Sequence, residues 1–277
     1  MEKQINYFLR YPGGKRRLLD FLKDHLPSPE SIKGYYIEPF VGSGAVFFYL
    51  EPNRALLSDA NPELIDIYRG IRYSPKRVWD AYRKFGSTKE DYRQVRDHKQ
   101  AENVVDRAAR MLFLNRTCFK GMWRHNREGK FNVGYGGQSR RWVISEEDLL
   151  SISKRLRKAK IYCSDFETII KNAGKGDFLF LDPPYKPHEQ EYTNSHYIWQ
   201  QFRFEDHQRL AEALKQAKKR GVEWAMTTSA HPNILALFRG FYAIKIPKGT
   251  GSLPGIMTKN SGEALISSYK TEGSTRL

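Results

Sequence analysis

The stretch YYIEPFVGSGAVFFYLEPNRALLSDANP, residues 35–62, decides the fold. Its apolar residues 35–40 predict a strand that runs into a glycine turn at residues 42–44, and residues 45–50 predict a helix. Residues 54–58 predict a second strand, and Pro62 suits the first turn of a further helix. Strands alternating with helices in this way predict parallel strands joined by crossover helices, that is, an α/β fold.

The same pattern returns in the last third of the chain. The expected strands there span residues 160–163, 178–181, 224–228, 241–246 and 264–269, and residues 204–220 predict an amphipathic helix that stops at Gly221. Between the two α/β parts, residues 75–85, 92–100 and 104–115 predict helices with charged faces. Residues 117–137 predict a loop or hairpin, and Ser145 with Asp148 three residues on predicts the start of a further helix. We therefore expect three segments: 1–70 and 159–277 as one catalytic domain, and 71–158 as an inserted lobe.

Two other segments carry local predictions. Residues 15–26 read as a short amphipathic helix that stops before Pro27 and Pro29. Residues 247–262 are rich in glycine and proline, which predicts a mobile loop.

The overall composition excludes several protein classes. The chain has 277 residues, of which 40% are hydrophobic and 13% aromatic, enough for a sizeable core and against wholesale disorder. It holds no apolar run long enough to span a membrane, and its first residues lack a secretory signal. Its two cysteines, Cys118 and Cys163, form neither a disulfide framework nor a metal-binding pair. We expect a cytoplasmic monomer that needs no metal.

Positive charge is concentrated in the middle of the chain. The formal net charge is +16, and residues 71–160 hold 23 Lys and Arg against 10 Asp and Glu, a net charge of +13. A solvated helical surface is one explanation, but such surfaces usually mix both signs. A block of one sign is more typical of a surface that meets the phosphate backbone of a nucleic acid.

The glycine turn and the next strand predict a nucleoside-binding site. Glycines let a ligand approach the backbone, and the N-terminus of the following helix offers unpaired N–H groups. Asp59 ends the next strand, where a carboxylate can accept hydrogen bonds from two ribose hydroxyls. The alternatives are a tight turn without a ligand and, for Asp59, a helix cap before Asn61 and Pro62.

The most specific motif is DPPY, residues 182–185, which directly follows the apolar strand at 178–181. Successive prolines hold the chain extended, and this leaves their carbonyls free as acceptors. Asp182 and the Pro183 carbonyl are placed to accept both hydrogens of an exocyclic amine, and Tyr185 to stack on a planar base. The alternative is a purely structural proline turn.

Five motifs together resemble the Dam-type, D12-class DNA adenine methyltransferases. They are RYPGGK (10–15), EPFVGSG (38–44), SDANPEL (58–64), NRTCFKGMWRHNREGKFNVGYG (115–136) and DPPY (182–185). The resemblance covers residues 7–270, with the motifs in the family's order. It implies a class I, Rossmann-like methyltransferase fold, S-adenosylmethionine as methyl donor with S-adenosylhomocysteine as product, and transfer to adenine N6 in double-stranded DNA. Because this amine is buried in the duplex, the base must be flipped out.

The resemblance also assigns residues. The implied catalytic residues are Asp182, Pro183, Pro184 and Tyr185. The implied cofactor-binding residues are Tyr11, Lys15, Glu38, Phe40, Gly42, Gly44, Asp59, Asp165, Phe166 and Asp182. At Tyr11 the family usually has Trp.

The resemblance places the DNA contacts in and around the inserted lobe. They are Arg10, Arg116, Phe119, Lys120, Arg124, Asn126, Arg140 and Arg141. Arg124 suits the two acceptors of a guanine, and Phe119, or else Trp123, suits a wedge in the gap left by the flipped base. The alternative for Arg124 is a phosphate contact. Lys120 and Trp123 depart from the loop that many members share, so the target sequence stays open.

Two other functions remain open from the residues alone. Related amino-group methyltransferases act on RNA, on cytosine N4 or on protein glutamine, although cytosine enzymes often have Ser and glutamine enzymes Asn in place of Asp182. A catalytically silent DNA-binding protein is the other alternative, and the intact Asp182 and Asp59 argue against it. Cytosine carbon-5 chemistry needs a nucleophilic Cys, usually after Pro, whereas Cys118 follows Thr117 and Cys163 follows Tyr162.

Overall fold

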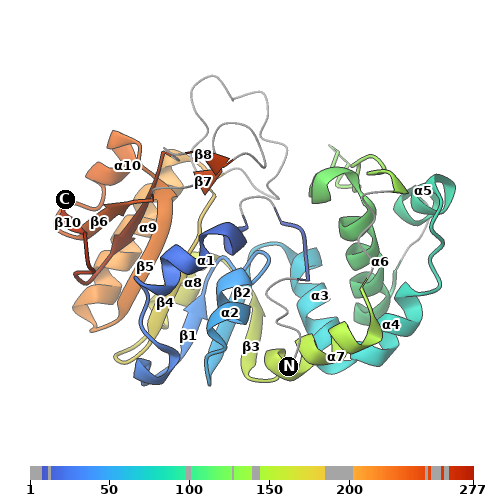
Figure 1. Ribbon diagram of the computed structural model, residues 1–277, viewed down its shortest axis with the longest axis horizontal. Coiled ribbons are helices and arrows are strands. Elements are labelled where there is room, and N and C mark those ends of the chain that lie inside the picture. Colours follow the sequence, from blue (N-terminus) through green and yellow to red (C-terminus); the bar gives the residue numbers. More distant parts are fainter. Residues whose placement is uncertain are drawn as a thin grey trace.

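One eight-stranded sheet organises the computed structural model of the chain (Figure 1). The structure describes residues 8–11, 14–97, 101–126, 128–138, 144–184, 202–246, 249–250, 257–258 and 262–277. The strands in spatial order are β10 (Thr275–Arg276), β6 (Tyr242–Lys245), β9 (Glu263–Ser267), β5 (Glu223–Ser229), β4 (Phe178–Leu181), β1 (Tyr36–Glu38), β2 (Ala55–Asp59) and β3 (Ala159–Cys163). A separate antiparallel pair joins β7 (Gly249–Thr250) to β8 (Met257–Thr258).

The strand directions define the fold. Strands β3, β2, β1, β4 and β5 are mutually parallel, and β9 runs antiparallel between β5 and β6. The order turns outward on both sides of β1 and β4, as in doubly wound sheets that bind ligands at the carboxyl ends of their strands. The predicted α/β fold of the class I methyltransferase type is confirmed, with two reversed strands, β9 beside β5 and β10 beside β6.

Two apolar cores lie on opposite faces of this sheet because successive side chains of a strand alternate between faces. In β4, Phe178 and Phe180 belong to one core, and Leu179 and Leu181 to the other. Both faces are covered, so β4 is buried at every position.

Helices of different parts of the chain cover the two faces (Figure 1). The first core includes residues from α1 (Leu19–Lys23), α2 (Ala45–Leu50) and α3 (Pro62–Tyr73). The second includes residues from α8 (Phe166–Lys171), α9 (Phe204–Lys219) and α10 (Pro232–Ala236). Short 3-10 turns span Lys15–Leu18, Pro29–Ser31 and Phe119–Gly121. None of the described helices has the length and apolar character needed to cross a membrane.

The helices of the middle third stand beside the sheet (Figure 1). They are α4 (Pro75–Tyr82), α5 (Lys89–Asp97), α6 (Val104–Thr117) and α7 (Glu146–Leu156). Their apolar residues, such as Leu112 and Leu149, belong to the same core as Leu57 and Phe178 of the sheet. The lobe is therefore packed onto the α/β part through a continuous core.

The local predictions hold with small shifts of the ends. α2 and β4 have the predicted bounds, and α7 begins at the predicted capping box of Ser145 and Asp148. The segment predicted as one helix at 15–26 is instead a 3-10 turn followed by the five-residue α1. Most of the predicted loop at 247–262 lies outside the described residues.

Candidate functional site

The glycine turn lies at the carboxyl end of β1. Gly42 and Gly44 have φ values of 48° and 66°, in the left-handed region that glycine adopts without strain. A Cβ on Gly42 would lie 3.2 Å from the ring of Tyr11, and one on Gly44 would lie 2.7 Å from the hydroxyl of Tyr68. The Tyr68 hydroxyl donates to the Gly42 carbonyl at 2.9 Å. Tyr11 and Tyr68 thus pack closely against the turn, and side chains larger than that of glycine do not fit at these two positions.

Asp59 ends β2 next to this turn. Its Oδ2 accepts from the Gly42 N–H and its Oδ1 from the Asn61 N–H, both at 3.1 Å. Burial raises the pKa of Asp59 to about 6, although its backbone hydrogen bonds favour the charged form and act in the opposite direction. Asn61, not Asp59, caps α3 by accepting from the N–H groups of Glu63 and Leu64. The helix-cap alternative for Asp59 is therefore wrong, and its carboxylate joins the turn to the second strand.

Tyr11 and Glu38 lie next to the same turn, Tyr11 against Gly42 and Glu38 at the end of β1. The Tyr11 ring lies between Gly42 and Trp123, whose ring centroid is 5.8 Å away. Glu38 is buried and accepts from the Tyr36 hydroxyl at 2.6 Å. Burial raises the pKa of Glu38 to about 8, so this carboxyl is mainly protonated at neutral pH.

Asp182 sits at the end of β4 between two donors. The buried Lys15 ammonium lies 2.8 Å from its Oδ1, and the Thr227 hydroxyl of β5 donates to the same oxygen at 2.8 Å. The β4–β5 pairing explains the second contact, because Leu181 is paired with Met226 and so Asp182 faces Thr227. Both contacts are to Oδ1, and no described residue makes a hydrogen bond or ion pair with the other carboxylate oxygen of Asp182.

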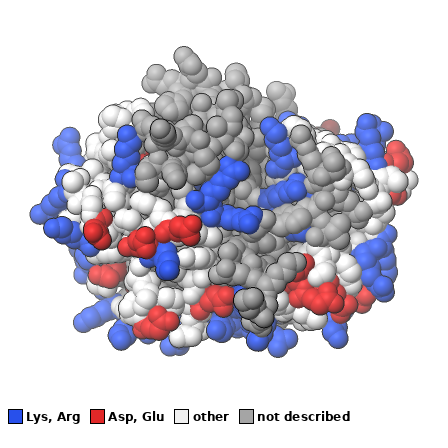
Figure 2. All heavy atoms as spheres, viewed as in Figure 1, with Lys and Arg blue, Asp and Glu red and all other residues white. Residues whose placement is uncertain are grey.

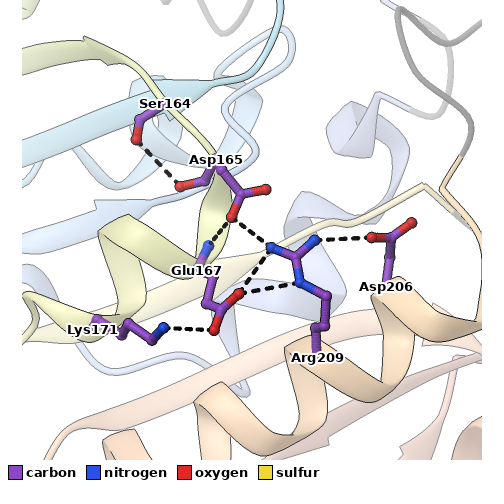
Figure 3. Close-up of polar contacts among 6 residues, drawn as sticks. All are labelled: Ser164, Asp165, Glu167, Lys171, Asp206 and Arg209. Carbon is purple, nitrogen blue, oxygen red and sulfur yellow. Dashed lines mark hydrogen bonds and ion pairs between the residues drawn. The ribbon is translucent and has the colours of Figure 1, made fainter.

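Asp165 and Phe166 follow β3 on the other side of the turn. Asp165 caps α8, and its carboxylate contacts Arg209 of α9 (Figure 3). Phe166 is buried, stacks on Phe40 at 5.3 Å, and lies under the Arg209 guanidinium at 4.9 Å. Phe40 and Phe166 thus form an aromatic wall, whereas Asp165 is directed outward.

The predicted loop or hairpin at 117–137 is a hairpin supported by bridges. Cys118 pairs with Tyr135, and His125 with Phe131. Phe119 lies in the 3-10 turn at the start of this hairpin, next to the Cys118–Tyr135 bridge. It is 40% exposed, and the Lys120 ammonium lies 5.3 Å from the centroid of its ring. On the face shown in Figure 2, one group of Lys and Arg side chains lies in the centre, and others lie at both sides and along the lower edge, interspersed with acidic residues.

Arg124 is held in place within the hairpin. Its Nε donates to Asn132 Oδ1 at 2.8 Å, and its Nη2 to the Asn132 carbonyl at 3.2 Å. No described residue contacts its Nη1. The Nη1–Nη2 edge of the guanidinium is therefore presented away from Asn132 in a fixed orientation.

Comparison with known proteins identifies the family of this chain. The family model of the D12 class N6 adenine-specific DNA methyltransferases matches residues 11–250. The chain belongs to this family. The D12-class reaction, methylation of the N6 amine of adenine in DNA, is therefore the reaction of this protein.

Three relatives illustrate the similarity. The chain is 32% identical to "Type II methyltransferase M.MjaIII" of Methanocaldococcus jannaschii over 88% of this chain and 91% of that protein. It is 28% identical to "DNA adenine methylase" of Escherichia coli K12, over 97% and 96% of the two chains. It is 37% identical to "DNA N-6-adenine-methyltransferase" of Escherichia phage P1, over 83% of this chain but 30% of the phage protein.

Two residues of the D12 hairpin region differ from the sequence-based expectation. Arg116 is only 2% exposed and donates to the Phe8 carbonyl, so DNA cannot reach it and its role is structural. Trp123 is 3% exposed, and its Nε1 donates to Glu63 at 3.0 Å, which excludes the alternative that Trp123 is the wedge. Both had been expected at the DNA surface because their side chains are typical of nucleic-acid contacts, and both are instead buried in the core.

The remaining predicted DNA contacts are placed as follows. Arg10 is half-buried against Gly121, and its backbone exchanges two hydrogen bonds with the Asn115 side chain. Asn126 is exposed, and its side-chain Oδ1 organises the hairpin turn by accepting from the backbone N–H groups of Glu128 and Lys130. Tyr185, Arg140 and Arg141 lie outside the described residues.

Three functional candidates escaped the sequence analysis. Thr227 contacts Asp182, and Arg209 contacts Asp165. Glu63 accepts from Trp123, and its carboxylate lies 2.9 Å from His125 Nε2. None of these contacts had a local signal in the sequence, because each joins residues more than 40 positions apart.

Proposed function

We propose that the protein is a site-specific, S-adenosylmethionine-dependent methyltransferase that acts on adenine flipped out of duplex DNA. The observation that carries this proposal is Asp182, which is fixed by Lys15 and Thr227 at 2.8 Å each and lies at the strand edge that also holds Asp59.

The groups along the sheet edge suit S-adenosylmethionine. Lys15 offers a cation for the methionine carboxylate, and the Gly42–Gly44 turn allows close approach of the ligand to the backbone. Asp59 offers an acceptor for the ribose hydroxyls, and Asp165 an acceptor for the adenine amine. When bound, the cofactor supplies an electrophilic methyl group.

Asp182 and Pro183 act on the target base. The Asp182 carboxylate and the Pro183 carbonyl accept the two hydrogens of adenine N6, which favours a tetrahedral nitrogen whose lone pair faces the methyl group. A nitrogen–carbon bond forms, the methyl–sulfur bond breaks, and the nitrogen then releases one proton. Thr227 and Lys15 already hold the Asp182 carboxylate in this orientation, so it does not have to reorient during methyl transfer.

The hairpin recognises the DNA. Phe119 is the exposed aromatic residue at its start, and we assign it as the wedge that fills the space of the flipped base. Arg124 is assigned to a guanine, because Asn132 presents its free edge in one orientation. Lys120 and the other basic residues of the lobe contact phosphates.

The decisive experiment compares methylation and cofactor binding in Asp182 variants. With labelled S-adenosylmethionine and unmethylated duplex DNA, Asp182→Ala abolishes methylation, while its affinity for S-adenosylhomocysteine changes far less than its turnover. Asp182→Asn is the companion variant, since it keeps the side-chain shape beside the buried Lys15. Near-normal turnover of either variant would refute the assigned role of Asp182. Methylation of RNA or protein in place of DNA would refute the substrate, and modification-aware sequencing identifies the base and its context.

A further inference from the structure

A network of charged side chains surrounds Asp165 at the start of α8 (Figure 3). Asp165 Oδ1 accepts from the Glu167 N–H at 2.9 Å and from Arg209 Nη2 at 3.0 Å. Arg209 also donates to Glu167 Oε2 from Nη2 and Nε, at 2.8 and 3.1 Å, and to Asp206 Oδ1 at 3.0 Å. All three guanidinium nitrogens of Arg209 are thus engaged with acidic side chains, and the guanidinium has one orientation.

The aromatic wall supports the same arrangement. The Arg209 guanidinium lies 4.9 Å from the centroid of the Phe166 ring, and Phe166 stacks on Phe40. A planar cation on a ring face is held by electrostatic attraction to the ring in addition to its hydrogen bonds. The Arg209 guanidinium is therefore held by hydrogen bonds to carboxylates and by its contact with the face of the Phe166 ring.

Stability alone does not account for this network. Arg209 and Asp165 are 43% and 48% exposed, and ion pairs at such positions contribute little to the free energy of folding. The other carboxylate oxygen of Asp165, Oδ2, makes no hydrogen bond or ion pair with a described residue, and it points away from Arg209 in Figure 3. The network therefore directs one acceptor outward.

The position of this acceptor relates it to the ribose site. Strands β2 and β3 are paired so that Asp59 lies opposite Cys163, and the Ser164 N–H donates to the Asp59 carbonyl at 3.1 Å. Asp165 is the next residue. The carboxylate assigned to the ribose and the free oxygen of Asp165 thus belong to adjacent strand ends, as a bound nucleoside requires.

We propose that Arg209 is a positioning residue that makes Asp165 select a 6-amino purine in the cofactor. This inference rests on the proposed function, in which Asp165 accepts from the cofactor's adenine amine. By taking Oδ1, Arg209 leaves Oδ2 of the Asp165 carboxylate as the acceptor that faces the purine. A purine with oxygen in place of the amine then meets a fixed negative charge.

The test measures binding of two ligands that differ at this one group. S-adenosylhomocysteine and S-inosylhomocysteine are titrated calorimetrically into the wild-type protein, Arg209→Ala and Arg220→Ala. Arg220 is a matched control, because it also ties α9 to α8, through the Ile170 and Ala173 carbonyls, at the far end of α8.

The expected pattern is specific to the amine. We expect wild type to prefer the adenosine compound by about tenfold or more, the size of a hydrogen bond to a charged group. Arg209→Ala weakens adenosine binding by roughly 3- to 10-fold and leaves inosine binding within about twofold, whereas Arg220→Ala changes neither. An equal loss for both ligands, or no loss for either, overturns the proposal, because a structural role would not distinguish the two purines.

Asp165→Ala separates this inference from the proposed function. If Asp165→Ala abolishes the preference for adenosine but Arg209→Ala retains it, Asp165 keeps its assigned role and the positioning role of Arg209 is wrong. If Asp165→Ala retains the wild-type preference, the assignment of Asp165 itself fails, and the inference about Arg209 fails with it.

Discussion

Removal of the Thr227 hydroxyl tests whether catalysis depends on how Asp182 is oriented. Thr227 is fully buried on β5, and its hydroxyl donates to Asp182 Oδ1 at 2.8 Å. Thr227→Val keeps the shape of the side chain and removes the donor. A hydrogen bond to a charged group contributes about 1.5–3 kcal/mol. Since Asp182 is 22% exposed and retains Lys15, we expect the lower end, a loss of about tenfold in the rate of methyl transfer.

Single-turnover methylation of duplex DNA, with enzyme in excess over DNA, measures this rate without a contribution from product release. The affinity for S-adenosylhomocysteine should remain within about twofold of wild type, because Thr227 orients Asp182 toward the target amine. Thr227→Ser keeps a hydroxyl and should restore most of the rate.

The adjacent residue supplies a matched control. Thr228 is also fully buried on β5, but its hydroxyl has no hydrogen-bond partner among the described residues. Thr228→Val should therefore leave the rate unchanged and should not reduce stability. A Thr227→Val rate within about twofold of wild type, or an equal loss in Thr228→Val, would contradict the proposed orientation of Asp182.

Three further predictions concern other residues. Burial raises the pKa of Asp59 to about 6, so the affinity for S-adenosylhomocysteine should fall about tenfold as the pH is lowered from about 7.5 to about 5, and calorimetry on Asp59→Asn should show no such dependence. Burial raises the pKa of Glu38 to about 8, above its unfolded value, so the free energy of unfolding should decrease as the pH rises from about 4.5 to about 8, and denaturant unfolding of Glu38→Gln should show a flatter profile over that range. Arg124→Ala should cost about 1–3 kcal/mol on the cognate site and little on a site altered at one base pair, as measured by competitive methylation of the two duplexes; an equal loss on both would identify Arg124 as a phosphate contact.

The sheet was predictable because its signals are local. In β4 and α2, apolar runs of the right length are bounded by turn residues, and the predicted bounds match the structure. The helices α8 and α10 were not predicted, because six and five residues are too few to show a helical pattern of apolar positions. Each begins at a capping side chain, Asp165 or His231, two residues after the end of a strand.

The candidate site was predictable where one motif carries its own chemistry. Asp182 and Asp59 could be placed from their strands alone, because carboxyl ends of parallel strands meet at one edge. Arg116 and Trp123 could not, since local sequence does not show whether a basic or aromatic residue of a helical lobe faces solvent or the core. Their burial depends on Phe8 and Glu63, which contact them across 108 and 60 positions of sequence.

The pairing of Arg10 with Asn115 has a consequence for the order in which the chain assembles during synthesis. The two residues are 105 positions apart, so at translation rates of about 5–20 residues per second the partner of Arg10 is made on the order of 5–20 s later. During that interval Phe8, whose ring packs against Phe48 and Tyr68 in the folded protein, still lacks Arg116, which donates to its carbonyl. We expect the first-made segment to dock after α6 has formed, and a nascent chain arrested before Asn115 to leave residues 8–11 open to proteases and chaperones.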